Sequence, residues 1–302
     1  MKNKKKKVIW LVIAFIFVAI FIACAVALFI DIFSRSPQIN PLNYKEINPL
    51  NYKETVSVTD PNNLETENNG NNEKQEEEIL SESEPEPEVI LANGQTKSQL
   101  KAEHSYDIDK MRSDINTDVL AWISIPGTEV DHPVLYHETE PLYYERRDAF
   151  GKYSVYGCIF AQCYNDDDFR DPNTILYGHY VTEGGASDTF FGTLHRYKNP
   201  EFFETNRYIY VTTENRILVY DIFAAYEYDD RHILAAVDFS NDAEYENYLQ
   251  NCLNPASMTR NVREGVELTA EDKIITLSTC TSYTNTSKRY LVQGVLVADV
   301  SR

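Results

Sequence analysis

Short apolar runs separated by turn residues dominate the sequence after residue 116. Eight of them have the length and the β-branched and aromatic content that are typical of strands. They are VLAWISI (119–125), VDHPVLY (130–136), SVYGCIFA (154–161), NTILYG (173–178), YIYVTT (208–213), RILVYDIFAAY (216–226), KIITLSTC (273–280) and RYLVQGVLVADV (289–300). Few helical patterns interrupt the series, so the sequence predicts a mainly β domain, a barrel or a sandwich.

Two segments have helical spacing instead. Residues 99–115 read as a helix before the first strand, and residues 241–253 read as an additional helix between late strands. The expected inward positions are Leu100, Ile108, Met111 and Ile115 in the first helix, and Tyr245, Tyr248, Leu249 and Cys252 in the second. We therefore expect one domain over residues 99–302, all-β with helical additions.

The N-terminus has the pattern of a membrane anchor. Residues 1–7 read MKNKKKK, and residues 8–30 carry no charge. As a helix this run spans about 34 Å, enough for a hydrocarbon core of about 30 Å. Lysines favour the cytoplasmic side, so we expect a cytoplasmic tail (1–7), a transmembrane signal-anchor (8–30) and an extracellular remainder. A cleaved signal peptide is the alternative, since small residues and Cys24 lie near the end of the run.

Residues 31–98 differ in composition from both flanks. INPLNYKE at 39–46 is repeated without change at 47–54, and residues 60–88 carry eleven acids and one lysine. Such a segment buries too little apolar surface to fold, so we expect a disordered, extended stalk, with a partner-binding tail as the alternative. The whole chain has a net charge of −19, which disfavours nucleic-acid binding.

The cysteines differ in their surroundings. Five cysteines are no disulfide framework. Cys163 could reach Cys158 to form one disulfide or metal pair, but no second pair at metal-ligand spacing exists to support a zinc site. Cys158 and Cys252 fall in apolar patterns and are predicted core thiols. Cys280 ends an apolar strand and is followed by the polar stretch TSYTNTS, an arrangement that can present a nucleophile.

One histidine and one arginine fit beside this thiol. His179 follows the strand 173–178, whose closing glycine lets the imidazole project from the barrel rim. Arg289 follows Cys280 by nine residues and opens the next strand. A loop this short can bring its two ends side by side, which would place Arg289 near Cys280. The other five histidines lie in polar surroundings and are predicted to be solvated.

Two of these motifs resemble the signatures of a known family. LSTC at 277–280 with an arginine opening the next strand, and ILYGH at 175–179, resemble those of the sortases, membrane-anchored cysteine transpeptidases of Gram-positive bacteria. The resemblance covers about residues 117–300 and is nearest to class B. FAQC at 160–163 departs from it, because class B members often carry an acidic residue in place of Gln162.

The resemblance implies an eight-stranded sortase-type β-barrel and a specific chemistry. Cys280 would attack the threonine carbonyl of a C-terminal sorting signal on a secreted protein, and His179 would act as general acid and base. Arg289 would bind the substrate and the oxyanion, while Ser278 and Thr279 would shape the binding pocket. The acyl group would pass to a peptidoglycan-precursor amine, without metal or organic cofactor.

Three alternatives remain at this point. A membrane-anchored cysteine peptidase would hydrolyse the acyl-enzyme only, and a pilin-polymerising sortase would use a lysine of a pilin as its amine. A surface-binding module without enzymatic activity would keep Cys280 as a core thiol.

Overall fold

The computed structural model describes residues 48–53, 90–180, 190–282 and 287–302. The predicted basic tail (1–7), transmembrane segment (8–30) and most of the predicted stalk (31–98) lie outside these residues. In the described part of the chain, no helix combines the length and apolar character needed to cross a membrane. The described residues belong to one compact unit that runs from Ile47 to Arg302.

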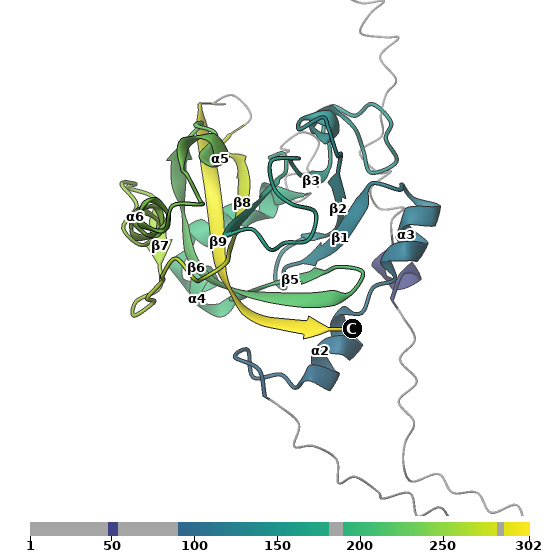
Figure 1. The fold of residues 1–302 in the computed structure, drawn as a ribbon, viewed down its shortest axis with the longest axis horizontal. Coiled ribbons are helices and arrows are strands. Elements are labelled where there is room, and N and C mark those ends of the chain that lie inside the picture. The colour runs from purple at the N-terminus through teal and green to yellow at the C-terminus, as the bar shows by residue number, and fades with distance from the viewer. Residues whose placement is uncertain (1–47, 54–89, 181–189, 283–286) are drawn as a thin grey trace, which may run out of the picture. The chain divides into compact units, whose positions relative to one another are not determined.

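Nine strands form a single sheet in this unit (Figure 1). They are β1 (Val119–Ser124), β2 (Asp131–Tyr136), β3 (Ile159–Ala161), β4 (Asn173–Tyr177), β5 (Tyr208–Thr212), β6 (Arg216–Asp229), β7 (Arg260–Val262), β8 (Ile274–Cys280) and β9 (Lys288–Ser301). Their order is β5-β1-β2-β3-β4-β8-β9-β6-β7, and a further pairing of β5 with β6 closes eight of them into a barrel. The predicted eight-stranded barrel is confirmed.

The ninth strand, β7, was not predicted. Its three residues are at most half-buried and show no apolar alternation, so the pattern along the chain contains no signal for it. β6 accommodates it because β6 is 14 residues long. One edge of β6 pairs with β9 along its length, while the other pairs first with β5 and then with β7.

The single helix predicted over residues 99–115 is wrong, because the structure has two helices there. α2 (Lys97–His104) and α3 (Ile108–Asp114) are separated by three residues. Tyr106 lies between them with its ring stacked on Trp122, the centroids 5.0 Å apart. Asp107 then begins α3, because its carboxylate accepts a hydrogen bond from the amide of Lys110 at 2.8 Å.

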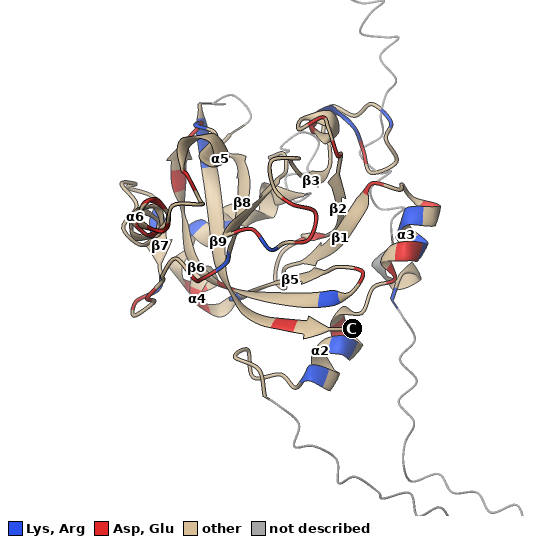
Figure 2. Ribbon diagram, viewed as in Figure 1, with Lys and Arg blue, Asp and Glu red and all other residues tan. Residues whose placement is uncertain are grey.

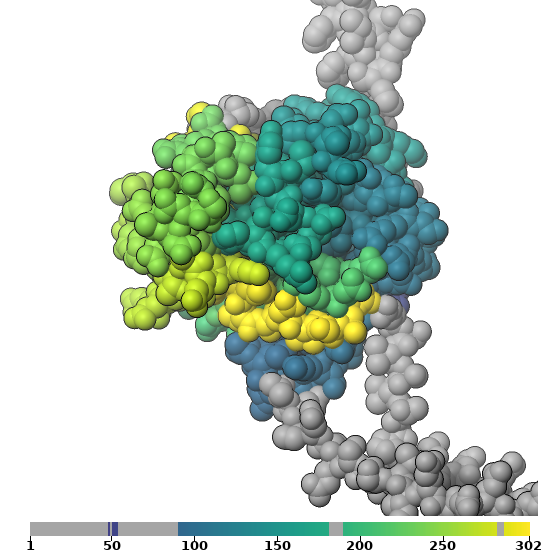
Figure 3. Space-filling model, in the orientation of Figure 1, coloured from purple at the N-terminus to yellow at the C-terminus, as the bar shows by residue number. Residues whose placement is uncertain are grey.

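The N-terminal elements pack against the closing strands of the barrel. Leu100 of α2 is fully buried in a cluster with Ile217, Val219 and Val300. The space-filling view shows the same contact, with the yellow end of β9 lying against the blue α2 (Figure 3). Residues 48–53, which belong to the second copy of the repeat, also contact this region, since the amide of Asp107 donates to the carbonyl of Tyr52 at 2.8 Å.

The predicted late helix is confirmed as α6 (Asp242–Leu253), with a short α5 (Ile233–Ala236) before it. Its buried positions are the four predicted ones, Tyr245, Tyr248, Leu249 and Cys252. They join a core cluster with residues of β4, β6, β8 and β9. α6 therefore covers the barrel on one side, next to the strands that carry Cys280 and Arg289.

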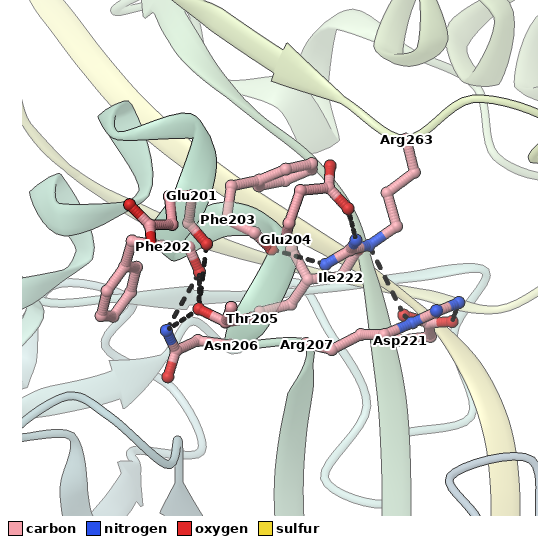
Figure 4. Close-up of polar contacts among 10 residues, drawn as sticks. All are labelled: Glu201, Phe202, Phe203, Glu204, Thr205, Asn206, Arg207, Asp221, Ile222 and Arg263. Carbon is pink, nitrogen blue, oxygen red and sulfur yellow. Dashed lines mark hydrogen bonds and ion pairs between the residues drawn. The ribbon is translucent and has the colours of Figure 1, made fainter.

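A buried arginine ties a second helical segment to the barrel. η5 (Phe191–Lys198) runs directly into α4 (Pro200–Thr205). Arg263, just after β7, donates from Nη2 to the carbonyl of Phe203 and from Nε to that of Ile222, both at 2.6 Å (Figure 4). Its Nη1 also donates to Glu204 at 2.8 Å.

Charged residues lie mainly outside the packed strands. Most of the strand length is uncharged, and acidic and basic residues gather on the helices and loops (Figure 2). Arg263 also lies outside the strands, just after β7, but its side chain is buried, only 7% exposed. Buried charges need partners, and Arg263 has them at each nitrogen.

Candidate active site

Parallel pairing of β4 and β8 brings the predicted histidine and cysteine to one rim of the barrel. Tyr177, the last residue of β4, is in register with Ser278 of β8. The amide of Gly178 continues the ladder by donating to the Ser278 carbonyl at 3.2 Å. His179 and Cys280 each come two residues after that pair, so they leave the sheet at the same edge.

Arg289 is the direct cross-strand neighbour of Cys280. β8 and β9 are antiparallel, and their register pairs Cys280 with Arg289. Directly opposed residues of such a pair point to the same face of the sheet. The proximity that the sequence predicts from the short loop is confirmed.

All five predicted site residues line one cavity of about 290 Å³. They are His179, Ser278, Thr279, Cys280 and Arg289. The hydroxyl of Thr279 has no hydrogen-bond partner among the described residues. Burial raises the pKa of Tyr177, which also lines the cavity, to about 12, and the positive charge of Arg289 opposes this rise.

A backbone carbonyl fixes the orientation of His179. Its Nε2 lies 2.9 Å from the carbonyl oxygen of Glu145, in η3 (Tyr143–Arg146). A carbonyl can only accept, so Nε2 carries a hydrogen and Nδ1 is the nitrogen left for proton exchange. Gly157 makes room for this carbonyl, because a Cβ at residue 157 would lie 2.5 Å from the Glu145 oxygen.

Gly178 has a similar steric role beside the imidazole. A Cβ at this position would lie 2.8 Å from the ring of Phe191. Real Cβ atoms do not approach other atoms so closely, so a side chain here would push Phe191 or the following residue, His179, out of place.

Two polar contacts beside the predicted site residues were not expected from the sequence. His195 places Nε2 3.0 Å from the carbonyl oxygen of Cys280. Gln162, which departs from the class B pattern, also lines the cavity, and its Oε1 lies 2.7 Å from Nε2 of His232. Neither pair has a local sequence signal, because its members are 85 and 70 residues apart.

The prediction that five histidines are solvated is wrong for His104, which is only 8% exposed. Its ring stacks on Tyr210 with the centroids 3.8 Å apart. Burial lowers the pKa of His104 to about 4. His195 is half-buried, and burial also lowers its pKa, although the Cys280 carbonyl favours the protonated ring.

The remaining cysteines follow the sequence prediction. Cys158 and Cys252 are buried, and burial raises the pKa of both thiols. All four cysteines of the described residues are free thiols. Over the same part of the chain, no group of three or more metal-ligating side chains is placed to hold an ion.

Known proteins share both the sequence pattern and the fold. The family model described as a sortase domain matches residues 123–297. Sortase B of Listeria monocytogenes is 29% identical over 206 residues, which cover 68% of this chain and 76% of that protein. Sortase B of Staphylococcus aureus is 30% identical over 184 residues, covering 61% and 72%.

Solved structures give the same similarity. The Staphylococcus aureus sortase B–substrate complex superimposes with a TM-score of 0.56 at 27% identity, covering 67% of this chain and 91% of that one. The structure of Clostridium perfringens sortase B has a TM-score of 0.55 at 29% identity, covering 63% and 100%. Sortase B complexed with triglycine has a TM-score of 0.56 at 27% identity, covering 67% and 92%.

Proposed function

This chain belongs to the class B sortases, a family of cysteine transpeptidases, and on that basis we propose that Cys280 is its nucleophile. The observation that carries the proposal is the shared cavity, in which Cys280 lies beside His179 and Arg289 at the ends of neighbouring strands. A thiol needs a nearby base or cation to react as a thiolate, and this cavity offers both.

The reaction has two halves. The sulfur of Cys280 attacks the carbonyl carbon of the threonine at the cleavage point, and His179 gives a proton to the departing amine as the peptide bond breaks. The product is a thioester between the threonine acyl group and Cys280. An incoming amine then attacks the thioester, His179 takes its proton, and the thiolate leaves as the new amide forms.

The remaining cavity residues stabilise the charge that develops during the reaction and give the pocket its shape. Arg289 donates charge-assisted hydrogen bonds to the substrate and to the oxyanion that forms at the attacked carbonyl. A planar guanidinium suits this role better than an ammonium group. Ser278 and Thr279 line the pocket and shape it.

The substrates are secreted proteins with a C-terminal sorting signal, and the acceptor is an amine of a peptidoglycan precursor. Support comes from the two related structures, one holding a substrate and the other triglycine, a peptide with a free amine. We place the reaction outside the cell, with residues 1–7 in the cytoplasm, 8–30 as the anchor and a stalk between the anchor and the catalytic domain. This arrangement rests on the charge and hydropathy pattern of the sequence. The boundary expected between residues 98 and 99 shifts towards the N-terminus, because α2 already begins at Lys97 and residues 48–53 contact the domain.

Mass spectrometry of the full chain tests the proposal. The protein is incubated with a panel of sorting-signal peptides, with and without triglycine. We expect a thioester adduct on Cys280 and a triglycine-ligated product, both lost in Cys280→Ala with a fall in rate of at least about a thousandfold. Cys163→Ala is the matched control, because Cys163 is a half-buried free thiol that does not line the cavity.

Two other product patterns would identify a different enzyme, and a third result would refute the nucleophile. Cleavage that triglycine leaves unchanged would mean a peptidase that only hydrolyses. Ligation to a lysine-bearing pilin in place of triglycine would mean a pilin-polymerising sortase. Full activity in Cys280→Ala would refute the assignment of the nucleophile.

A further inference from the structure

The carbonyl of Cys280 lies where both neighbouring strands stop pairing with it. On the β9 side, the amide of Thr281 donates to the carbonyl of Lys288 at 3.3 Å, so these two residues form the hydrogen-bonded pair. Hydrogen-bonded and non-bonded pairs alternate in an antiparallel ladder, so Cys280 and Arg289 are a non-bonded pair. The Cys280 carbonyl therefore points away from β9.

On the opposite side, β4 has already ended. In the parallel ladder the amide of Gly178 donates to the Ser278 carbonyl, and the next step would bring the amide of Tyr180 to the Cys280 carbonyl. β4 ends at Tyr177, and the Cys280 carbonyl meets the imidazole of His195 instead, with Nε2 at 3.0 Å. A side chain from η5 thus takes the place of the missing strand.

The imidazole of His195 is itself held in place. It stacks on Tyr180 with the centroids 4.4 Å apart and the planes at 16°, and it also contacts Tyr290, 5.0 Å away. Tyr290 directly follows Arg289 on β9, so the two side chains point to opposite faces of the sheet. His195 therefore contacts Cys280 from the face of the sheet opposite to Arg289, and it is not among the residues that line the cavity.

The Cys280 carbonyl determines which ring nitrogen of His195 carries the hydrogen. A carbonyl oxygen only accepts hydrogen bonds, so Nε2 of His195 is the donor. Lys198 and Glu227 are the charged groups near the ring, and they act on its charge in opposite directions. These two residues also pair with each other, with Nζ of Lys198 3.2 Å from Oε1 of Glu227.

We infer that His195 is a positioning residue for the transpeptidation: its Nε2–H holds the backbone of Cys280 so that the thiol meets the scissile carbonyl and His179 in a reactive geometry. The inference rests on the proposed role of Cys280 as the nucleophile. Reaction rates depend steeply on such placement, because reacting atoms must already lie at near-contact distance. Cys280 needs this support because it is the last residue of β8.

Packing and hydrogen bonding can be separated by substitution. His195→Phe keeps an aromatic ring between Tyr180 and Tyr290 but leaves the Cys280 carbonyl without its donor. His195→Gln loses the stacking but carries an amide N–H that can donate. His104→Phe is the matched control, since it replaces another histidine stacked on a tyrosine, 3.8 Å from Tyr210 and outside the cavity.

The full chain is assayed for kcat and KM with the sorting-signal peptide that the panel identifies and with triglycine. Iodoacetamide alkylation of Cys280 is followed alongside, because it needs no substrate. We expect His195→Phe to lower kcat about tenfold, the usual effect of one hydrogen bond, while KM changes less than about twofold. His195→Gln recovers most of the loss, and His104→Phe stays at the wild-type kcat.

Two results would overturn the inference. One is a His195→Phe variant with wild-type kcat. The other is a His195→Gln variant as slow as His195→Phe with both melting temperatures lowered, which would assign the residue to packing alone. The Cys280→Ala variant distinguishes a failure of this inference from a failure of the proposed function. If Cys280→Ala retains activity, the assignment of the nucleophile is wrong. If Cys280→Ala is inactive while His195→Phe is unaffected, only the role of His195 is refuted.

Discussion

Replacing Arg263 by methionine should destabilise the barrel more than any surface charge substitution. Methionine fills a similar volume without charge or donors. The change removes the hydrogen bonds to the carbonyls of Phe203 and Ile222, both at 2.6 Å, and the one to Glu204 at 2.8 Å. Asp221, whose Oδ1 lies 3.9 Å from Nε of Arg263, still has a partner after the change, because Arg207 donates two hydrogen bonds of 2.7 and 2.6 Å to its carboxylate.

The size of the effect follows from the two backbone carbonyls. A buried acceptor that loses its donor costs about 1–3 kcal/mol, and two of them lose theirs. Removing the guanidinium also removes the cost of keeping a charge in a site where the side chain is only 7% exposed, which offsets part of the loss. We expect a net fall of about 3 kcal/mol in the free energy of unfolding, and about 6–12 °C in melting temperature.

Urea unfolding followed by tryptophan fluorescence and by circular dichroism measures this loss. Arg170→Met serves as the control, because the Arg170 side chain is 64% exposed and its ion pair within the described residues is with Asp168 on the surface. Such a pair contributes at most about 1 kcal/mol. A loss below about 1 kcal/mol in Arg263→Met would contradict the argument that this arginine holds α4 against β6.

Three further outcomes follow from the described contacts. Burial lowers the pKa of His104 to about 4, so this residue should lower the free energy of unfolding by up to about 3 kcal/mol as pH drops from 6.5 towards 4. In pH-resolved urea titrations His104→Phe should remove that share and leave the part due to His132, whose pKa burial also lowers to about 4. Gly157→Ala should lower kcat more than about tenfold, because its Cβ would displace the Glu145 carbonyl that orients His179, the proposed general base; an unchanged kcat would disprove that support. Iodoacetamide at pH 8 should leave Cys158 and Cys252 unmodified in the folded protein, since burial raises the pKa of both thiols, and peptide mapping that found them alkylated would contradict their burial.

Much of the barrel could be predicted from local pattern, because each of its eight strands is an apolar run bounded by turn residues. The proximity of Cys280 and Arg289 was also predictable, since a short loop joins their strands. The pairing of β4 with β8 was not, because no local feature tells which parallel strands become neighbours. The same limit applies to His195, whose contact with Cys280 depends on where η5 packs after the barrel has closed.

The break between α2 and α3 shows a different limit. Apolar residues continue at helical spacing through this region, but Tyr106 stacks on Trp122 between the two helices, and Asp107 caps the start of the second one. The stacking is a tertiary contact, which overrides local propensity.

The place of β9 in the sheet sets the order in which the enzyme can become active. β9 lies between β6 and β8, so the ring of eight strands cannot close without it. A nascent chain that has reached residue 270 already contains β1 to β7 and the proposed general base, His179, but it has neither the proposed nucleophile, Cys280, nor Arg289. Synthesis therefore makes the thiol only after seven strands of the sheet and directly before the strand that completes its surroundings, so a chain that stops short of residue 280 has no means of forming a thioester on this residue.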